Sequence, residues 1–303
     1  LTSLNLGGFP VASQGQLYYA TSNQLGDAVI LYALVQGPLW QEIERQVAPC
    51  GPAQYHQGCG DDLALLLFTS GSTGVPKGVM QPHRTIMAAV KGIALHNDFH
   101  HDDVSMNWMP LEHVGGIVMS QIRDAYLCCS QVQVRTDYIL SSPLRWLDVI
   151  DKYRASITWA PNFAYGLVNE HLDRLKASGE EREWDLSCMK FSLNGGEAVN
   201  AVNAKSYLNR LSVYGLPGDA MKPAWGMSET CSGVLYSHAL TPEPGTGIQC
   251  LDKHSLSDTV KPGSGDADSV TFTELGRTIP GLSVRIVGPD NQLLPEGKVG
   301  RLQ

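Results

Sequence analysis

Residues 68–78, FTSGSTGVPKG, carry the strongest structural signal in the chain. They directly follow an apolar run at residues 63–68, which is typical of a buried strand. The ten residues 69–78 hold four hydroxyl side chains, three glycines and one lysine. Glycines let backbone N–H groups approach an anion closely, and hydroxyls add further donors. We therefore expect a phosphate-binding loop rather than a solvated turn. The expected contacts are Thr69, Ser70, Gly71, Ser72, Thr73, Gly74 and Lys77.

The residues beside Lys77 exclude the ordinary P-loop of nucleoside triphosphatases. That motif places Gly-Lys-Ser/Thr where a helix begins. Here Pro76 precedes the lysine and lacks a backbone donor, and Gly78 follows it and disfavours a helix. The loop must therefore bind phosphate in another structural context.

Around this loop, predicted strands alternate with predicted helices. This pattern indicates an α/β fold with a mostly parallel sheet flanked by helices, which binds ligands at the carboxyl ends of its strands. Asn162 is well placed to cap the helix that begins there. The expected strands are residues 63–68, 104–109, 156–160 and 189–193, and the expected helices are residues 84–95, 143–153, 162–177 and 201–213.

The two ends of the chain have a different character. The apolar run at residues 28–35 fits either a strand or a short helix. Residues 240–270 are rich in Pro, Gly, Ser and Asp, which favours a mobile surface connection. We expect residues 1–60 to be a partial upstream segment, residues 61–280 a ligand-binding α/β unit, and residues 281–303 the beginning of a small β-rich subdomain.

Composition narrows the class of protein. The 303 residues are 43% hydrophobic and 17% charged, which excludes a mostly disordered chain. The formal net charge of −8 argues against nucleic acid as a general partner. No apolar run approaches the roughly 20 residues that span a membrane. Seven cysteines, none in a CxxC pattern, are typical of reduced thiols in a cytoplasmic protein.

Four stretches, in order along the chain, resemble motifs of the AMP-forming adenylating enzymes. This superfamily includes acyl-CoA synthetases, luciferases, fatty-acyl-AMP ligases and the adenylation domains of peptide synthetases. Its phosphate loop reads [YF]TSG[ST]TGxPKG, which residues 68–78 reproduce. Residues 194–198, NGGEA, resemble its adenine-side loop, and residues 224–230, AWGMSET, resemble its GYGxTE segment. Residues 109–116, MPLEHVGG, resemble the loop that borders its acyl pocket.

The resemblance implies a role for each residue of the third motif. Trp225 replaces the usual tyrosine, and with Gly226 beside it we expect its ring to stack on adenine; a core tryptophan is the alternative. Ser228 stands where the superfamily has threonine and is expected to reach the α-phosphate. Glu229 matches the Mg²⁺ ligand, because hard carboxylate oxygens suit that ion; a solvated surface acid is the alternative.

The other motifs supply the remaining candidate residues. Gly195, Gly196 and Glu197 are expected to flank the nucleobase. His113 is expected near the carboxylate entrance, where it gates the site or lends positive charge, although a structural histidine is equally consistent. The candidate substrate-binding residues are His113, Gly115, Gly116, Asn162, Phe163 and Asn194. Gly115 and Gly116 have no side chain, which leaves space for a substrate. Phe163 and Tyr165 also fit as core aromatics.

The resemblance implies that ATP and Mg²⁺ activate a small carboxylic acid to acyl-AMP, with release of pyrophosphate. A thiol, from coenzyme A or the 4'-phosphopantetheine arm of an acyl carrier protein, then takes the acyl group. No protein nucleophile is evident: the chain has no GxSxG motif. Residues 110–116 contain no aspartate to pair with a substrate ammonium, so we expect a fatty or other acid without an α-amino group.

The sequence around these motifs further resembles the fatty-acyl-AMP-ligase-like loading domains of polyketide and nonribosomal peptide synthases. An amino-acid-activating domain and a nucleotide-binding relative without activity are the alternatives. An oxidoreductase lacks support, because no GxGxxG lies between a strand and a helix. The ribose-binding aspartate, the hinge and the C-terminal lysine of the superfamily are expected beyond Gln303, so we expect a fragment of the large N-terminal domain, truncated at both ends, with weak activity.

Overall fold

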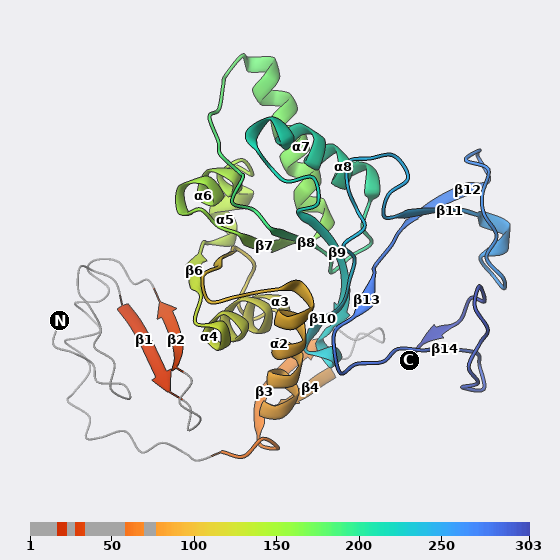
Figure 1. Ribbon diagram of the computed structural model, residues 1–303, viewed down its shortest axis with the longest axis horizontal. Helices are drawn as coiled ribbons and strands as arrows, with labels where there is room; N and C mark the ends of the chain where they lie inside the picture. Colours follow the sequence, from red (N-terminus) through yellow and green to blue (C-terminus); the bar gives the residue numbers. More distant parts are fainter. Residues whose placement is uncertain (1–16, 23–27, 34–57, 70–76) are drawn as a thin grey trace.

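The computed structural model describes residues 17–22, 28–33, 58–69 and 77–303. Its centre is a seven-stranded sheet in the order β13-β10-β9-β8-β7-β5-β6 (Figure 1). Five neighbouring strands are parallel, and β10 runs antiparallel to both of its neighbours. The strands are β5 (Val104–Asn107), β6 (Ser130–Gln133), β7 (Ile157–Ala160), β8 (Phe191–Asn194), β9 (Met221–Met227), β10 (Ser232–Tyr236) and β13 (Arg277–Thr278).

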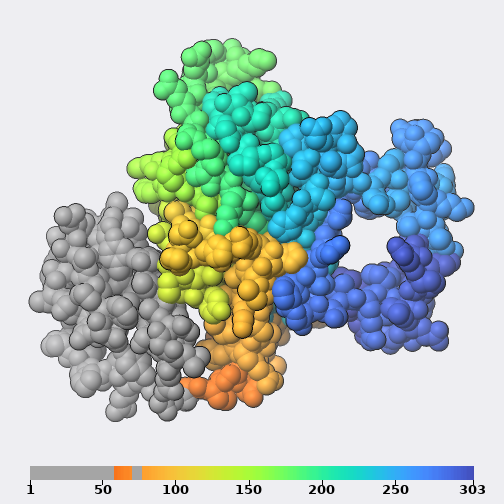
Figure 2. All heavy atoms as spheres, viewed as in Figure 1, coloured from red at the N-terminus to blue at the C-terminus, as the bar shows by residue number. Residues whose placement is uncertain are grey.

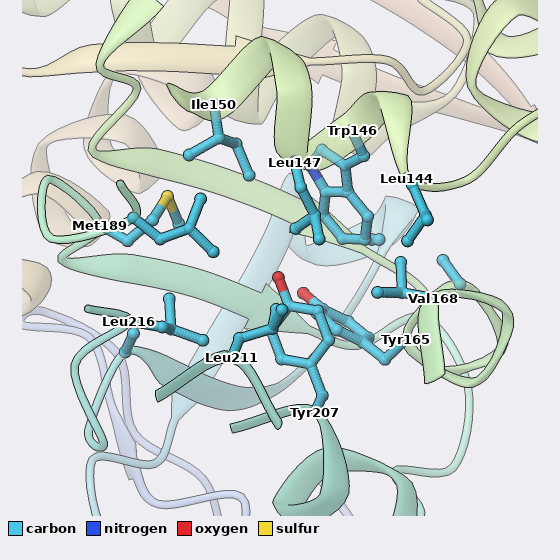
Figure 3. Packing of buried hydrophobic residues seen from close by; sticks show 14 of the residues in the cluster. Leu144, Trp146, Leu147, Ile150, Tyr165, Val168, Met189, Tyr207, Leu211 and Leu216 are labelled. Atoms are coloured by element: carbon cyan, nitrogen blue, oxygen red, sulfur yellow. The ribbon is translucent and has the colours of Figure 1, made fainter. Parts of the chain in front are cut away.

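Helices cover both faces of this sheet, which confirms the α/β expectation. One face packs against α6, α7 and α8, where Trp146, Tyr165 and Tyr207 form an aromatic cluster (Figure 3). The other face packs against α2 and the π-helical segment η1. The helical elements are α2 (His83–Asn97), α3 (Val114–Gly116), η1 (Ile117–Ile122), α4 (Arg123–Leu127), α5 (Thr136–Leu140), α6 (Arg145–Tyr153), α7 (Asn162–Ser178) and α8 (Ala201–Leu211).

The strand before the phosphate loop exists, but the expectation that it is buried is wrong. Strand β3 (Leu63–Thr69) pairs antiparallel with β4 (Lys77–Pro82), which forms a hairpin. Only its inner face, with Leu67, packs on α2 and η1, and Phe68 on the outer face is 72% exposed. Lys77 begins a strand and not a helix, as the flanking Pro76 and Gly78 predicted.

The expected cap of α7 is also wrong. Pro161 occupies the N-cap position, and Asn162 is the first residue of the helix. The Asn162 Oδ1 atom instead accepts hydrogen bonds from Asn194 Nδ2 at 3.2 Å and from the Asn200 backbone N–H at 3.0 Å. Its side chain therefore links the start of α7 to the end of β8 and to the residue before α8, and it does not cap its own helix.

Short antiparallel strands make up much of the C-terminal part. Residues 240–270, expected as a mobile connection, contain β11 (Ile248–Asp252), which pairs with β12 (Ser269–Thr273). Strands β14 (Ile286–Val287) and β15 (Arg301–Leu302) also pair, in agreement with the predicted strands there. Both pairs project from the α/β body (Figure 2). At the other end β2 (Ala28–Ala33) pairs with β1 (Leu17–Ser22), so a strand is the correct alternative for that run.

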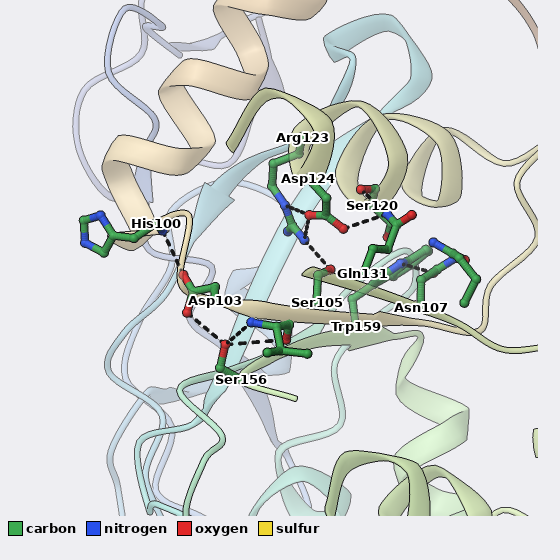
Figure 4. A network of polar contacts seen from close by, with 12 residues as sticks. His100, Asp103, Ser105, Asn107, Ser120, Arg123, Asp124, Gln131, Ser156 and Trp159 are labelled. Atoms are coloured by element: carbon green, nitrogen blue, oxygen red, sulfur yellow. Dashed lines mark hydrogen bonds and ion pairs between the residues drawn. The ribbon is translucent and has the colours of Figure 1, made fainter. Parts of the chain in front are cut away.

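A buried ion pair lies between α4 and the sheet. Arg123 donates to Asp124 Oδ1 from Nε at 2.8 Å and from Nη2 at 2.6 Å (Figure 4). Arg123 Nη2 also donates to Ser105 Oγ at 2.9 Å, and Gln131 Nε2 donates to Asp124 Oδ2 at 2.8 Å. These bonds fix α4, and with it η1, against β5 and β6. Among the described residues, no helix is long and apolar enough to cross a bilayer.

Candidate active site

A cavity of about 510 Å³ lies where the parallel strands end, beside the end of β3 and the start of β4. This is the edge at which sheets of this kind bind ligands. Ten of the predicted residues line it: Thr69, Lys77, His113, Gly115, Gly195, Gly196, Trp225, Gly226, Ser228 and Glu229. The structure therefore brings the three main motifs together. Ser70, Gly71, Ser72, Thr73 and Gly74 lie outside the described residues.

Six predicted residues do not line the cavity. A Cβ atom on Gly116 would overlap the Pro110 carbonyl oxygen, so this glycine permits close backbone packing and leaves no open space. Glu197 Oε1 accepts the backbone N–H of the half-exposed Phe163 at 2.6 Å, which links the loop after β8 to the first turn of α7. Asn162 and Asn194 are buried and hydrogen-bonded to each other, and neither lines the cavity. Tyr165 is a core residue, as its alternative stated.

One end of the cavity offers a flat apolar surface beside glycine backbone. Trp225 near the end of β9 is partly exposed there. A Cβ on Gly195 would lie 2.8 Å from the Ala224 carbonyl oxygen, so only glycine fits this approach. Gly196 has φ of +82° with open space beside it. The indole and this glycine backbone line the same cavity, and together they offer the kind of surface that suits a planar ring.

The opposite end is polar. Thr69 and Lys77 are paired residues at the end of β3 and the start of β4, and Ser228 and Glu229 lie on the single turn η3 (Ser228–Thr230). The ammonium of Lys77 and the hydroxyls suit phosphate oxygens. Glu229 is the only carboxylate among the described lining residues, and no cluster of three or more metal-ligating side chains occurs in the described chain. One carboxylate beside phosphate groups fits the usual way in which Mg²⁺ is held.

Sequence reasoning missed Gln81, which holds the η3 turn. This side chain on β4 is only 2% exposed. Its Nε2 donates to the Ser228 carbonyl oxygen at 2.6 Å, and its Oε1 accepts the thiol of Cys231 at 2.8 Å. Burial raises the pKa of Cys231 to about 11, so the thiol keeps its proton and remains a donor. No local pattern indicates this link, because it joins residues 147 positions apart.

The antiparallel pair of β9 and β10 forms the cavity wall next to Trp225. A Cβ on Gly226 would overlap the Ser232 carbonyl oxygen, so this position needs glycine. Ser232 itself has φ of 122°, which is rare for a residue with a side chain. Thr230 Oγ1 donates to the Ser232 carbonyl oxygen at 2.8 Å and helps to hold this strained backbone.

His113 stands between the polar and apolar ends. Its Nδ1 accepts the backbone N–H of Gly115 at 3.1 Å, and its ring stacks on Trp159 at a centroid distance of 5.9 Å. Partial burial lowers the pKa of His113 below its ordinary value of 6.5, and the negative charge of Glu112 offsets part of this shift. The imidazole is therefore neutral at pH 7, which favours a gating role over a positive charge.

We expect the imidazole of His113 to titrate below pH 6.5 in the folded protein, as an NMR titration of its ring protons would measure. As the pH falls, the unfolded chain takes up this proton before the folded protein does. The contribution of the neutral His113 to folding stability is therefore complete above about pH 6.5 and is lost as the pH falls through the lowered pKa of the folded protein. The variant His113→Gln identifies the signal by its disappearance. A midpoint at or above 6.5 would contradict the burial argument.

Comparisons with known proteins agree with this geometry. A family model described as AMP-binding enzyme matches residues 19–303. The chain is 34% identical over 256 residues to the nonribosomal peptide synthetase apvA of Aspergillus terreus, which covers 83% of this chain but 25% of that protein. The chain thus spans about a quarter of the length of the curated relatives it matches.

Two solved structures show the same architecture. An adenylation domain of a keto acid-selecting NRPS module, bound to keto acyl adenylate, superimposes with a TM-score of 0.77 at 41% identity, covering 82% of this chain and 44% of that one. The McyG A-PCP structure complexed with phenylalanyl-adenylate gives a TM-score of 0.73 at 39% identity, with 86% and 37% covered. The phosphate-loop motif, the shared cavity and these matches together establish that the chain belongs to the AMP-binding enzyme family.

Proposed function

We propose that this chain forms the site of an acid–thiol ligase that activates a carboxylic acid with ATP to give acyl-AMP and pyrophosphate. One observation carries the proposal: a single cavity gathers Lys77 of the hairpin, the indole of Trp225 and the carboxylate of Glu229. These groups match the phosphates, the base and the metal ion of one Mg·ATP molecule. The two solved adenylation domains that resemble the chain support it.

In this reaction a carboxylate oxygen of the acid attacks the α-phosphorus, and the bond from that phosphorus to the pyrophosphate oxygen breaks. The obstacle is repulsion between the carboxylate and the triphosphate. Lys77 and the hydroxyl of Ser228 offset this charge and hold the phosphates in line, while Trp225 and Gly195 hold the adenine. Bound at Glu229, Mg²⁺ would neutralise further phosphate charge. Pre-positioning and electrostatics therefore suffice without a protein nucleophile.

The proposed substrate is an acid without an α-amino group. The only carboxylate among the described lining residues is Glu229, and the proposal assigns it to Mg²⁺. A substrate ammonium would thus lack a charged partner, which costs several kcal/mol in a partly desolvated site. Similarity to a keto acid-selecting domain supports 2-oxo acids, alongside fatty acids, as substrate classes. An amino acid is the alternative, since McyG A-PCP is complexed with phenylalanyl-adenylate.

The proposed acceptor of the acyl group is a thiol on a carrier protein or on coenzyme A. Similarity to McyG A-PCP favours the phosphopantetheine arm of a carrier protein. Within the chain, we propose that residues 61–280 form the ATP- and acyl-binding unit and that residues 281–303 begin a β-rich subdomain, with residues 1–60 as an upstream segment of the first.

ATP–pyrophosphate exchange by the full-length protein tests this function. The panel contains 2-oxo acids, fatty acids and the amino acids with matching side chains. We expect exchange with an acid that lacks the α-amino group and at least about tenfold less with its amino counterpart. Preference for the amino acid would overturn the substrate proposal. ATP binding without exchange for any acid would instead identify a non-catalytic nucleotide-binding relative.

A further inference from the structure

Besides its polar lining and the glycine surface beside Trp225, the cavity has a buried apolar region. Val114, Met119, Trp159 and Leu193 line it, and all four are buried. Trp159 is the largest of them and lies near the carboxyl end of β7, only 7% exposed. Its indole therefore forms the wall that an apolar substituent of a bound acid would meet.

A hydrogen bond fixes this indole from behind. Trp159 Nε1 donates to Asn107 Oδ1 at 3.0 Å, across the β5–β7 pair (Figure 4). Asn107 is fully buried, and its Nδ2 donates to the Met109 carbonyl oxygen and to Gln133 Oε1, both at 2.9 Å. The Asn107 amide thus has little freedom to rotate, and the indole N–H would lose its buried partner if the ring turned.

The front of the same ring is fixed by packing. A Cβ atom on Gly115 would clash with Trp159 Cζ2 and would lie 2.5 Å from Cη2, so the indole edge fills the place of a side chain there. The His113 ring stacks on the indole with an interplanar angle of 25°. A rigid aromatic wall held on both sides does not yield to a longer substrate without breaking these contacts.

We propose that Trp159, locked by Asn107 and Gly115, closes the cavity at this buried apolar region and restricts the activated acid to a short or branched side chain. The inference rests on the proposed function and narrows its substrate class. A cavity of about 510 Å³ is in the range of a single small-molecule site, yet it must hold the nucleotide and the acid together. An extended fatty acyl chain would need the volume that the indole occupies.

The test compares pyrophosphate exchange by the full-length protein for linear acids from butanoic to dodecanoic acid. We expect wild type to favour the short acids. Trp159→Leu should raise the ratio of kcat/KM for decanoic over butanoic acid by at least about tenfold, because added methylene groups then find an apolar site. The ratio is unaffected by partial loss of folded protein, since both acids are measured on the same sample.

Trp108→Leu is the matched control. Trp108 is equally buried near the end of β5, but it packs edge-on against Trp146 in the other core cluster. We expect it to lower stability and to leave the decanoic-to-butanoic ratio unchanged. A ratio that rises in both variants would attribute the effect to general loosening of the sheet and would overturn the inference.

A second pair of variants tests the lock itself. Gly115→Ala should push the indole into the cavity and lower kcat/KM for every acid, whereas Trp159→Phe in the same chain should restore much of the loss, because the smaller ring leaves room for the methyl group. Wild-type preference for dodecanoic acid, or an unchanged ratio in Trp159→Leu, would refute the inference alone. Absence of exchange with any acid by wild type would refute the proposed function.

Discussion

Glu229→Gln is expected to lower the rate of ATP–pyrophosphate exchange by the full-length protein by about 10²–10³-fold, the usual effect of removing one electrostatic contact to a transition state. The amide keeps the size of the side chain and removes its charge. Glu229 is the only carboxylate among the described residues that line the cavity, so no neighbour there replaces it. If Glu229 acts by holding Mg²⁺, the variant should also need more Mg²⁺ to reach half of its own maximal rate.

The exposed Glu183 provides a control for this substitution, because it does not line the cavity. Glu183→Gln should exchange pyrophosphate at the wild-type rate with the wild-type Mg²⁺ dependence. Wild-type activity of Glu229→Gln would remove the metal-binding role from this residue. A lower rate with an unchanged Mg²⁺ dependence would assign Glu229 a role in positioning η3.

Asp124→Ala is expected to cost about 3–5 kcal/mol in the free energy of unfolding, because it leaves the charge of Arg123 buried without its partner. The two side chains are only 3% and 2% exposed. Domains of this kind are stable by only about 5–15 kcal/mol, so the loss is a large fraction of the total. Urea unfolding followed by tryptophan fluorescence measures it.

Two further variants separate the ion pair from simple loss of contacts. Replacing both partners, as Arg123→Met with Asp124→Leu, should be less destabilising than Asp124→Ala, since no unpaired charge remains. Asp137→Ala removes a partner from the exposed Arg135–Asp137 pair and should hardly change the unfolding curve. Equal losses in Asp124→Ala and Asp137→Ala would contradict the argument from burial.

The local patterns predicted the four longest helices of the α/β unit and its strands β3, β5, β7 and β8. Helices α2, α6, α7 and α8 begin and end within a few residues of their expected ranges. The errors have tertiary causes. The apolar run of β3 resembles a buried strand, yet its hairpin with β4 packs on one face only. Asn162 has the chemistry of a cap, yet its side chain bonds Asn194 and Asn200.

The sequence by itself determined the family and the order of its motifs, and it supplied the candidate residues for the proposed phosphate, base and metal contacts, because those depend on short-range patterns. Only the tertiary structure decided which of those residues face the cavity. Side-chain direction on a strand follows from its register with neighbours far away in the chain. That is why Trp225 lines the cavity and Asn194 does not, and why the roles of Gln81 and Asn107 become visible only when the strands are paired.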